Sequence, residues 1–145
     1  IMDVLTAMKI SGSALKAERI RINVASMNLA NANTTRTIEG GPYKAKSVVF
    51  GARRVEGTFK EAFDSVGDKL RKVEVVEVVE DNTPFTEVYD PNHPDADENG
   101  IVKLPNVNTV EQMVDLMSAR RDYEANVAAL DAVKNMALKA LEISR

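Results

Sequence analysis

The residues whose types and spacing could support ion binding lie in an acidic stretch. Their side-chain oxygens alternate, and a glycine follows, as in the first half of a calcium loop: Asp95, Asp97, Asn99 and Gly100. The second half departs from that pattern, because the ninth position is Lys103 and the twelfth, where a bidentate glutamate belongs, is Asn106. Calcium binding is therefore the alternative, and a surface loop built from Asx turns is the preferred interpretation.

Catalytic chemistry has little support elsewhere in the chain. His93 is the only histidine and there is no cysteine, so one chain cannot build a multi-histidine or thiolate metal site. The 22 carboxylates look like solvated faces of strands and helices, and no glycine-rich phosphate loop is present. We therefore expect no enzyme, no catalytic residue, no cofactor and no bound metal.

Amide side chains dominate the stretch NLANANTTRT, residues 28–37, which follows a long apolar-periodic segment. One interpretation is a helix end, at which Asn31 or Asn33 replaces glycine in the left-handed conformation. The other is recognition between subunits, because buried amides at Asn28 and Asn31 offer donors and acceptors to a neighbouring chain. The two interpretations are compatible, and we predict that at least one asparagine contacts another subunit.

A second polar cluster, RRDYEAN at residues 120–126, interrupts the apolar positions of the C-terminal segment. Arg120 falls on the expected apolar seam, where a charge is costly unless it is paired. Either its aliphatic stem lies along the seam with the charge in water, or it bonds across chains, which we favour. The predicted subunit-interface residues are therefore Asn28, Asn31, Asn33, Thr34, Arg120, Tyr123 and Asn126.

Two long helices must position these side chains. The first is expected from Val4 to about Leu29. Apolar residues recur there every seven positions, at Ile1, Met8, Leu15, Ile22 and Leu29. Leu5, Val24 and Met27 broaden this apolar stripe. Gly12 lies in the middle of this helix, where glycine costs about 1 kcal/mol relative to alanine. It marks either a site of close backbone approach or simply a weak point of the helix.

The second helix is expected from Thr109 to about Ile143. Thr109 and Gln112 have the spacing of a capping box, and no glycine or proline follows. Its apolar residues keep three-four spacing: Met113, Leu116, Tyr123, Val127, Leu130, Ala137 and Leu141. We expect the two helices to pair, and their outer apolar positions then need other chains.

The middle of the chain is predicted to be rich in β structure. Strands are expected over residues 43–50, 72–79, 85–89 and 101–104, with a bulge where the alternation slips between Val75 and Val76. A capping box at Thr58–Glu61 predicts a short helix with Phe59, Phe63 and Val66 on one face. Residues 90–100 form a turn-rich loop between the last two strands.

Bulk composition fits one modest folded domain. The chain has 145 residues, 44% of them apolar and 28% charged, with a net charge of −3. This charge gives no electrostatic case for nucleic acid. No apolar run is long enough for a membrane span, and no segment resembles a secretory signal, so we expect no direct membrane insertion.

The motif NLANANT at the end of an N-terminal amphipathic helix resembles the shared signature of the axial proteins of the bacterial flagellum, which include rod and hook subunits. Residues 89–127, YDPNHPDADENGIVKLPNVNTVEQMVDLMSARRDYEANV, narrow the resemblance to a proximal rod subunit. This implies a structural subunit of the basal-body drive shaft, which transmits motor torque and encloses the export channel. It implies export without a cleaved signal peptide into the periplasmic rod. The implied partners are further copies, other rod proteins, adapter proteins at the rod base and the flagellar export apparatus.

The expected fold class is α+β. Long N- and C-terminal helices form an antiparallel coiled-coil pair with a small β-rich middle segment. The expected division is a discontinuous helical core domain, residues 1–38 plus 106–145, and a β-rich outer segment, residues 39–105. By the same resemblance, amides in the helix seam fix the register between neighbours in a stiff shaft.

Overall fold

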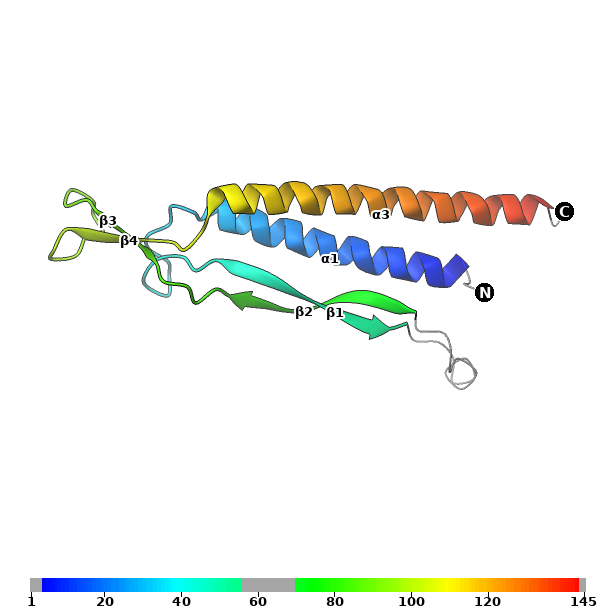
Figure 1. Ribbon diagram of the computed structural model, residues 1–145, viewed down its shortest axis with the longest axis horizontal. Coiled ribbons are helices and arrows are strands. Elements are labelled where there is room, and N and C mark those ends of the chain that lie inside the picture. The colour runs from blue at the N-terminus through cyan, green and yellow to red at the C-terminus, as the bar shows by residue number, and fades with distance from the viewer. Residues whose placement is uncertain (1–3, 56–69, 144–145) are drawn as a thin grey trace. The chain divides into compact units, whose positions relative to one another are not determined.

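Helix α1 (Val4–Ala30) ends in a run of right-handed turns (Figure 1). The computed structural model describes residues 4–55 and 70–143. The amide of Asn31 donates to Met27 O (3.1 Å) and that of Thr34 to Asn31 O (3.0 Å). Among the described residues only glycines have positive φ, so the predicted left-handed asparagine is wrong. Instead, Asn31 Nδ2 also donates to Met27 O at 2.9 Å, so this carbonyl in the last turn of the helix accepts from both the backbone and the side chain of Asn31.

Helix α3 (Thr109–Ile143) has the predicted bounds but a different cap. Asn108 Oδ1 accepts from the amides of Val110 (3.1 Å) and Glu111 (3.3 Å). Asn108 is therefore the N-cap, and the capping box assigned to Thr109 and Gln112 is wrong. The Gln112 side chain is used elsewhere, as an acceptor for Asn28.

The covered face of α3 follows a seven-residue repeat. Eight of the buried and half-buried positions follow steps of four and three residues: Gln112, Leu116, Ala119, Tyr123, Asn126, Leu130, Val133 and Ala137. This is the spacing of a helix that packs along a second helix. The other half-buried positions, Asp115, Ser118 and Asp122, each lie directly beside one of these. Three residues assigned to the seam, Met113, Val127 and Leu141, are exposed instead. Arg120 is also exposed, beside the fully buried Ala119, so its predicted position on the seam is wrong.

Gly12 does not mark a close approach. A Cβ atom built there meets no atom within 4 Å apart from its chain neighbours and the local backbone of its own helix. The prediction of close backbone contact at Gly12 is therefore wrong within a single chain, and the residue is a weak point of α1.

The first sheet pairs β1 (Lys46–Arg54) with β2 (Arg71–Glu80), whose arrows run in opposite directions (Figure 1). Both strands overlap the predicted ones, and β1 runs four residues farther than expected. A Cβ at Gly51 of β1 would lie 2.5 Å from Val76 Cγ2 of β2, so only glycine leaves room for that side chain. The bulge predicted beside Val76 stays a prediction.

The second sheet is the predicted hairpin of β3 (Thr86–Tyr89) and β4 (Ile101–Leu104). The strands are antiparallel, with Thr86 opposite Leu104 and Tyr89 opposite Ile101. Gly100 closes the connecting loop at φ 76°, and a Cβ there would lie 3.0 Å from the Tyr89 ring. This position therefore favours glycine on both conformational and steric grounds.

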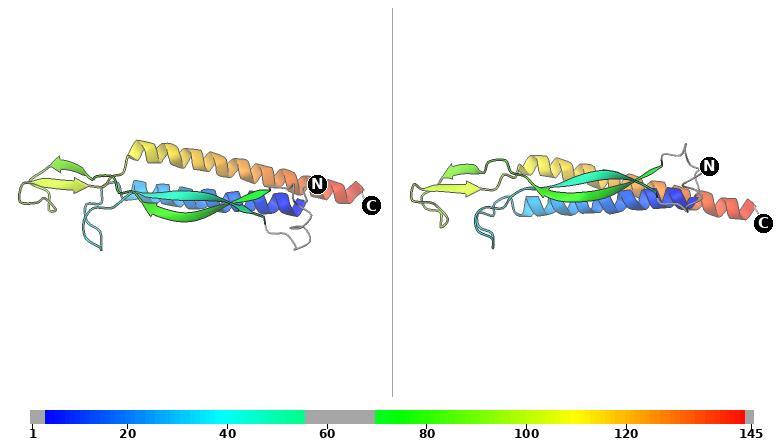
Figure 2. Two further views of the ribbon diagram at one scale, coloured as in Figure 1. Left: turned by 60° about the horizontal axis from the view of Figure 1, so that its bottom comes forward. Right: turned by 90° about the horizontal axis from the view of Figure 1, so that it is seen from below.

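The chain divides into two compact units that each combine helix and strand segments. The described parts of one are residues 4–20, 50–55, 70–76 and 119–143, and the other contains residues 21–49 and 77–118. Within each unit, the α1 segment lies beside the α3 segment and runs in the opposite direction (Figures 1 and 2). The α+β class with two long terminal helices is confirmed. The division into residues 1–38 plus 106–145 and 39–105 concerns position in an assembly and stays a prediction.

Buried side chains are mostly small. Five of the seven buried apolar residues are alanines, whereas 20 large apolar side chains are exposed in the described part of the chain. The predicted helix around Thr58–Glu61 lies outside the described residues. None of the described helices is long and apolar enough to cross a membrane.

Candidate functional site

Asn28 is the centre of the site, on the last turns of α1. Its side chain is 1% exposed and is the largest that is fully buried in the described residues. Nδ2 donates to Lys46 O (2.7 Å) and to Gln112 Oε1 (2.9 Å). Oδ1 accepts from Tyr43 Oη (3.0 Å) and from the Lys46 amide (2.9 Å). The amide of this α1 residue thus fills two donor and two acceptor positions with groups from β1, α3 and Tyr43, which precedes β1.

Tyr43 keeps its proton at this site. Burial, and secondarily the negative charge of Glu80, raise the pKa of Tyr43 above its ordinary value of 10.0. A protonated hydroxyl donates to Asn28 Oδ1, which a tyrosinate cannot do. Glu80 itself lies 3.8 Å from Lys44 Nζ and 3.9 Å from Lys46 Nζ. The phenol is therefore a fixed hydrogen-bond donor around neutral pH.

Asn106 forms a second amide node in the same unit. Nδ2 donates to the carbonyl oxygens of Asp81 (3.0 Å) and Thr83 (3.2 Å) and to Thr83 Oγ1 (2.9 Å). Oδ1 accepts from the Ala45 amide at 2.8 Å. Sequence reasoning considered this residue only as a failed calcium ligand. Its position directly after Pro105, at the end of a predicted strand, was the only signal for a structural role.

An ion pair joins the two helices nearby. Arg21 of α1 donates from Nε to Asp115 Oδ1 at 2.9 Å, and its Nη2 contacts the same oxygen. Both side chains are partly covered, so the pair is less screened than an exposed one. Periodicity alone did not indicate this pair, because both residues are charged and fall beside the expected apolar stripe.

The seven predicted interface residues are divided between the two units. Asn28, Asn31, Asn33 and Thr34 belong to one unit, where Thr34 Oγ1 donates to Asn31 Oδ1 (3.2 Å) and Asn33 is exposed. The other three lie on α3 in the other unit: Arg120, Tyr123 and Asn126. Arg120 is exposed, Tyr123 is half-buried, and Asn126 Nδ2 donates to the Asp122 carbonyl at 2.8 Å. Whether any of them contacts another chain stays a prediction.

The carboxylates of Asp95 and Asp97 in the candidate calcium loop accept hydrogen bonds from the chain itself. Asp97 Oδ1 accepts from the amides of Asn99 and Ile101, each at 2.9 Å, as in an Asx turn. Asp95 Oδ2 accepts from Thr35 Oγ1 at 2.7 Å. Over residues 4–55 and 70–143, no three His, Cys, Asp or Glu side chains are placed to hold a metal ion together. The calcium alternative has no support.

Unpartnered apolar side chains form the remaining feature of the unit that holds Asn28. The first turns of α3 present four of them to solvent at spacings of three and four residues: Val110, Met113, Val114 and Met117. These residues are half to two-thirds exposed, and an apolar row of this kind is typical of an interaction surface. We call these four residues the α3 face.

Comparison with known proteins assigns the family. The family model described as "Flagella basal body rod protein" matches residues 8–36, and the model "Flagellar basal body rod FlgEFG protein C-terminal" matches residues 98–143. The flagellar basal-body rod protein FlgC of Salmonella typhimurium is 42% identical over 144 residues, covering 99% of this chain and all of the relative. The chain belongs to the FlgC family of flagellar basal-body rod proteins.

Other FlgC proteins match over similar lengths. That of Bacillus subtilis is 40% identical over 156 residues, covering 99% of this chain and all of the relative. That of Borreliella burgdorferi is 38% identical over 152 residues, covering 98% of each. The two stretches matched by rod-family models contain Asn28 and the α3 face, so these features lie in the parts of the chain that carry the family resemblance.

Proposed function

We propose that this chain is a structural subunit of the rod of the bacterial flagellar basal body, without enzymatic activity. The identity of 42% over 99% of the chain to a FlgC rod protein carries this proposal. The chain assembles with further copies of itself and with other rod proteins. It works in the proximal rod, as part of the shaft that transmits motor torque and encloses the export channel.

The exposed apolar residues support a subunit that completes its packing in an assembly. Helices in proteins are stabilised mainly by the burial of an apolar face. The α3 face remains open in the single chain, and burying one such side chain contributes about 1.5–3 kcal/mol. We infer that neighbouring subunits cover this face.

The asparagine nodes have a supporting role in this function. Asn28 joins α1, β1 and α3, so it fixes the relative positions of the segments within its own unit that present the α3 face. Among the predicted interface residues, the exposed Asn33 and Arg120 are better placed to reach another chain than Asn28, whose hydrogen-bonding positions are filled.

The proposed location and partners follow from family membership. The chain reaches the periplasmic rod through the flagellar export apparatus. There, the helical part, residues 1–38 plus 106–145, lies toward the channel and residues 39–105 lie outside it. Adapter proteins at the rod base are further proposed partners.

A complementation experiment tests the proposal. A Salmonella typhimurium strain that lacks its own FlgC would receive an epitope-tagged copy of this chain, and purified basal bodies would be probed for the tag. We expect the tag in the rod fraction and restored swimming. An exported chain that never enters basal bodies would argue against a rod function. Replacing Asn33 by Ala should leave export intact and reduce incorporation if this amide contacts a neighbour.

A further inference from the structure

A closed loop presents one isoleucine directly to solvent. The loop follows α1 and is tied at its base by the Tyr43 amide, which donates to Thr34 O at 3.0 Å. Closer to the tip, the Thr37 amide donates to Gly41 O (2.8 Å), and the Gly40 amide donates back to Thr37 O (3.1 Å). These bonds define a single tight turn and hold the tip in place before any partner binds.

The tip combines an apolar and an acidic side chain. Ile38 has a relative exposure of 108%, the highest of the exposed apolar residues in the described chain. Glu39 follows it, is exposed, and forms no ion pair with any residue that the structure describes. Gly40 and Gly41 have φ values of 87° and 81°, a conformation that other residues rarely adopt. The glycines therefore fix the turn that places Ile38 and Glu39 together.

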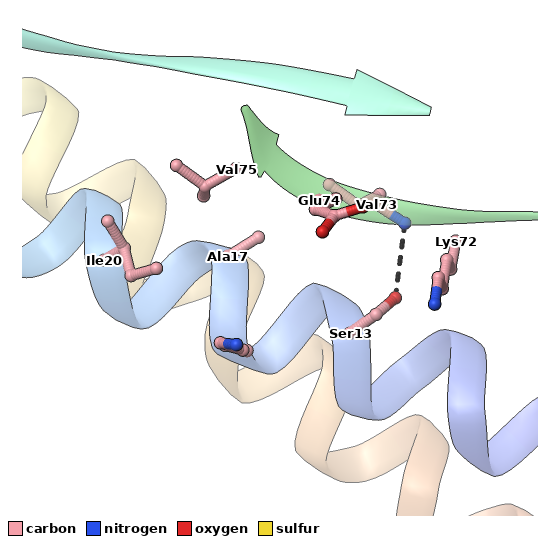
Figure 3. Close-up of a pocket in the computed structure, with 8 residues that line it drawn as sticks. Ser13, Ala17, Ile20, Lys72, Val73, Glu74 and Val75 are labelled. Carbon is pink, nitrogen blue, oxygen red and sulfur yellow. Dashed lines mark hydrogen bonds between the residues drawn. The ribbon is translucent and has the colours of Figure 1, made fainter. Parts of the chain in front are cut away.

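A groove of complementary character lies in the other unit, between α1 and β2. Its volume is about 250 Å³ (Figure 3). Apolar side chains from both elements line it: Ala17, Ile20, Val73 and Val75. Ser13 holds the two elements at a fixed separation, because its Oγ accepts from the Val73 amide at 3.2 Å and donates to Ile10 O at 2.7 Å. The groove is therefore a built feature of the unit.

The charged lining of the groove is mostly basic. Lys16 and Lys72 line it, and neither forms a salt bridge with a residue in the described part of the chain. The one acidic lining residue, Glu74, is paired with Arg53 Nη1 at 3.3 Å. The groove thus combines two ammonium groups with an apolar floor formed by the four apolar lining residues.

We propose that the Ile38 loop of one copy docks into the α1–β2 groove of a second copy. Ile38 covers the apolar floor, and the Glu39 carboxylate pairs with Lys16 or Lys72. The partner is a second copy because loop and groove match in both polarity and charge. Made in one direction only, this contact joins two different surfaces and can be repeated from copy to copy along an assembly. The inference rests on the proposed rod function and identifies one contact between subunits of the rod.

Cross-linking tests this contact directly, since the chain contains no cysteine. Differently tagged copies carrying Ile38→Cys and Val75→Cys would be expressed together, and basal bodies would be treated with a short bismaleimide. We expect an adduct that carries both tags. A pair of Ile38→Cys and Leu138→Cys is the matched control, because Leu138 is an exposed apolar residue of α3 outside the groove. This control should give no adduct above background.

Each outcome decides something different. Both tags in basal bodies without the mixed adduct, or with an equal adduct in the Leu138 control, overturns the docking contact and leaves the rod function intact. Absence of both tags from basal bodies overturns both proposals.

Charge exchange provides a second test with surface substitutions alone. Glu39→Lys on the loop copy should lower the adduct yield about fivefold, as expected for the loss of one modest ion pair. Lys16→Glu together with Lys72→Glu on the groove copy should restore it. An adduct yield that stays the same with Glu39→Lys, and with Lys16→Glu and Lys72→Glu added, would contradict the proposed ion pair.

Discussion

At the scale of single residues, Asn28 of the asparagine motif forms its hydrogen bonds within its own chain. The recognition interpretation took Asn28 to be buried, but the sequence could not reveal which groups would surround the amide. Those groups come from β1 and α3, far along the chain, and only the fold brings them together. The structural role of Asn106 could not be predicted for the same reason, because its partners Ala45, Asp81 and Thr83 lie far away in the sequence.

Replacing Asn28 by Ala should destabilise the chain by at least about 3 kcal/mol. The change leaves Tyr43 Oη, Gln112 and both backbone groups of Lys46 without their partner, and each buried unpaired group costs about 1–3 kcal/mol. Urea unfolding followed by circular dichroism measures this. Asn33→Ala, at an exposed position, is the matched control and should change stability by less than about 0.5 kcal/mol. Similar stabilities of the two variants would contradict the role assigned to Asn28.

Stability should decline at high pH through Tyr43. Its pKa is raised in the folded chain, so its contribution is complete below pH 10, the ordinary pKa, and is lost as the pH rises from there through the folded value. Unfolding free energies measured from about pH 8 to about pH 11, a range that spans the ordinary pKa of tyrosine, would show this decline. Tyr43→Phe should flatten it, whereas Tyr89→Phe, at an exposed tyrosine, should retain it. An unchanged decline in Tyr43→Phe would rule out this origin.

At the scale of elements, the sequence predicted which helices and strands form and where they begin and end better than it predicted which face of a helix is covered. The bounds of α3 and the hairpin of β3 and β4 agree with prediction because periodicity and turn residues are local signals. The covered side of α3 does not agree throughout, because Gln112 and Asn126 lie on it while Met113 is exposed. A hydrophobic pattern assigns apolar residues to the inside, and it fails where the fold leaves them exposed, as at Met113.

The cap of α3 can be tested by a pair of substitutions. Asn108→Ala should destabilise the chain by about 1 kcal/mol, because two amides of the first turn lose their acceptor. Thr109→Ala should have a much smaller effect, since Thr109 lies within the helix. Chemical unfolding of both variants distinguishes the two assignments. A larger loss for Thr109→Ala would restore the capping box predicted from the sequence.

Replacing Gly12 by Ala should stabilise the isolated chain by about 1 kcal/mol. The added methyl group meets no atom within 4 Å, so the gain in helix propensity is not opposed by a clash. The helical signal in circular dichroism should persist to higher temperature. If the variant is less stable than the parent, the environment described for Gly12 is wrong.

At the scale of the whole molecule, the chain contains a small number of large buried side chains and many exposed apolar ones. Tyr43 and Val102 are the only buried apolar residues larger than alanine in the described part. Such a surface is compatible with a subunit of the flagellar rod family, because neighbouring subunits can cover apolar side chains that are exposed in the single chain. The family itself was evident from NLANANT and residues 89–127, whereas which apolar residues of α3 stay exposed became clear only from the fold.

A charged substitution on the α3 face should separate folding from assembly. Val114→Asp places a carboxylate at an exposed position and should change the stability of the isolated chain by less than about 0.5 kcal/mol. Incorporation into basal bodies should fall strongly, because burying that charge against an apolar partner is costly. Glu111→Asp, a conservative change at an exposed position on the same helix, should assemble normally. Normal incorporation of Val114→Asp would exclude this residue from the interface.

The most direct test is whether the α3 face becomes protected on assembly. Met117→Cys introduces the only thiol of the chain, at a position 66% exposed in the single subunit. Maleimide labelling would be compared between the isolated protein and purified basal bodies, with unfolded protein giving full reaction. We predict rapid labelling of the isolated subunit and strong protection in the rod. Equal labelling in both states would contradict the claim that the chain completes its packing only among other subunits.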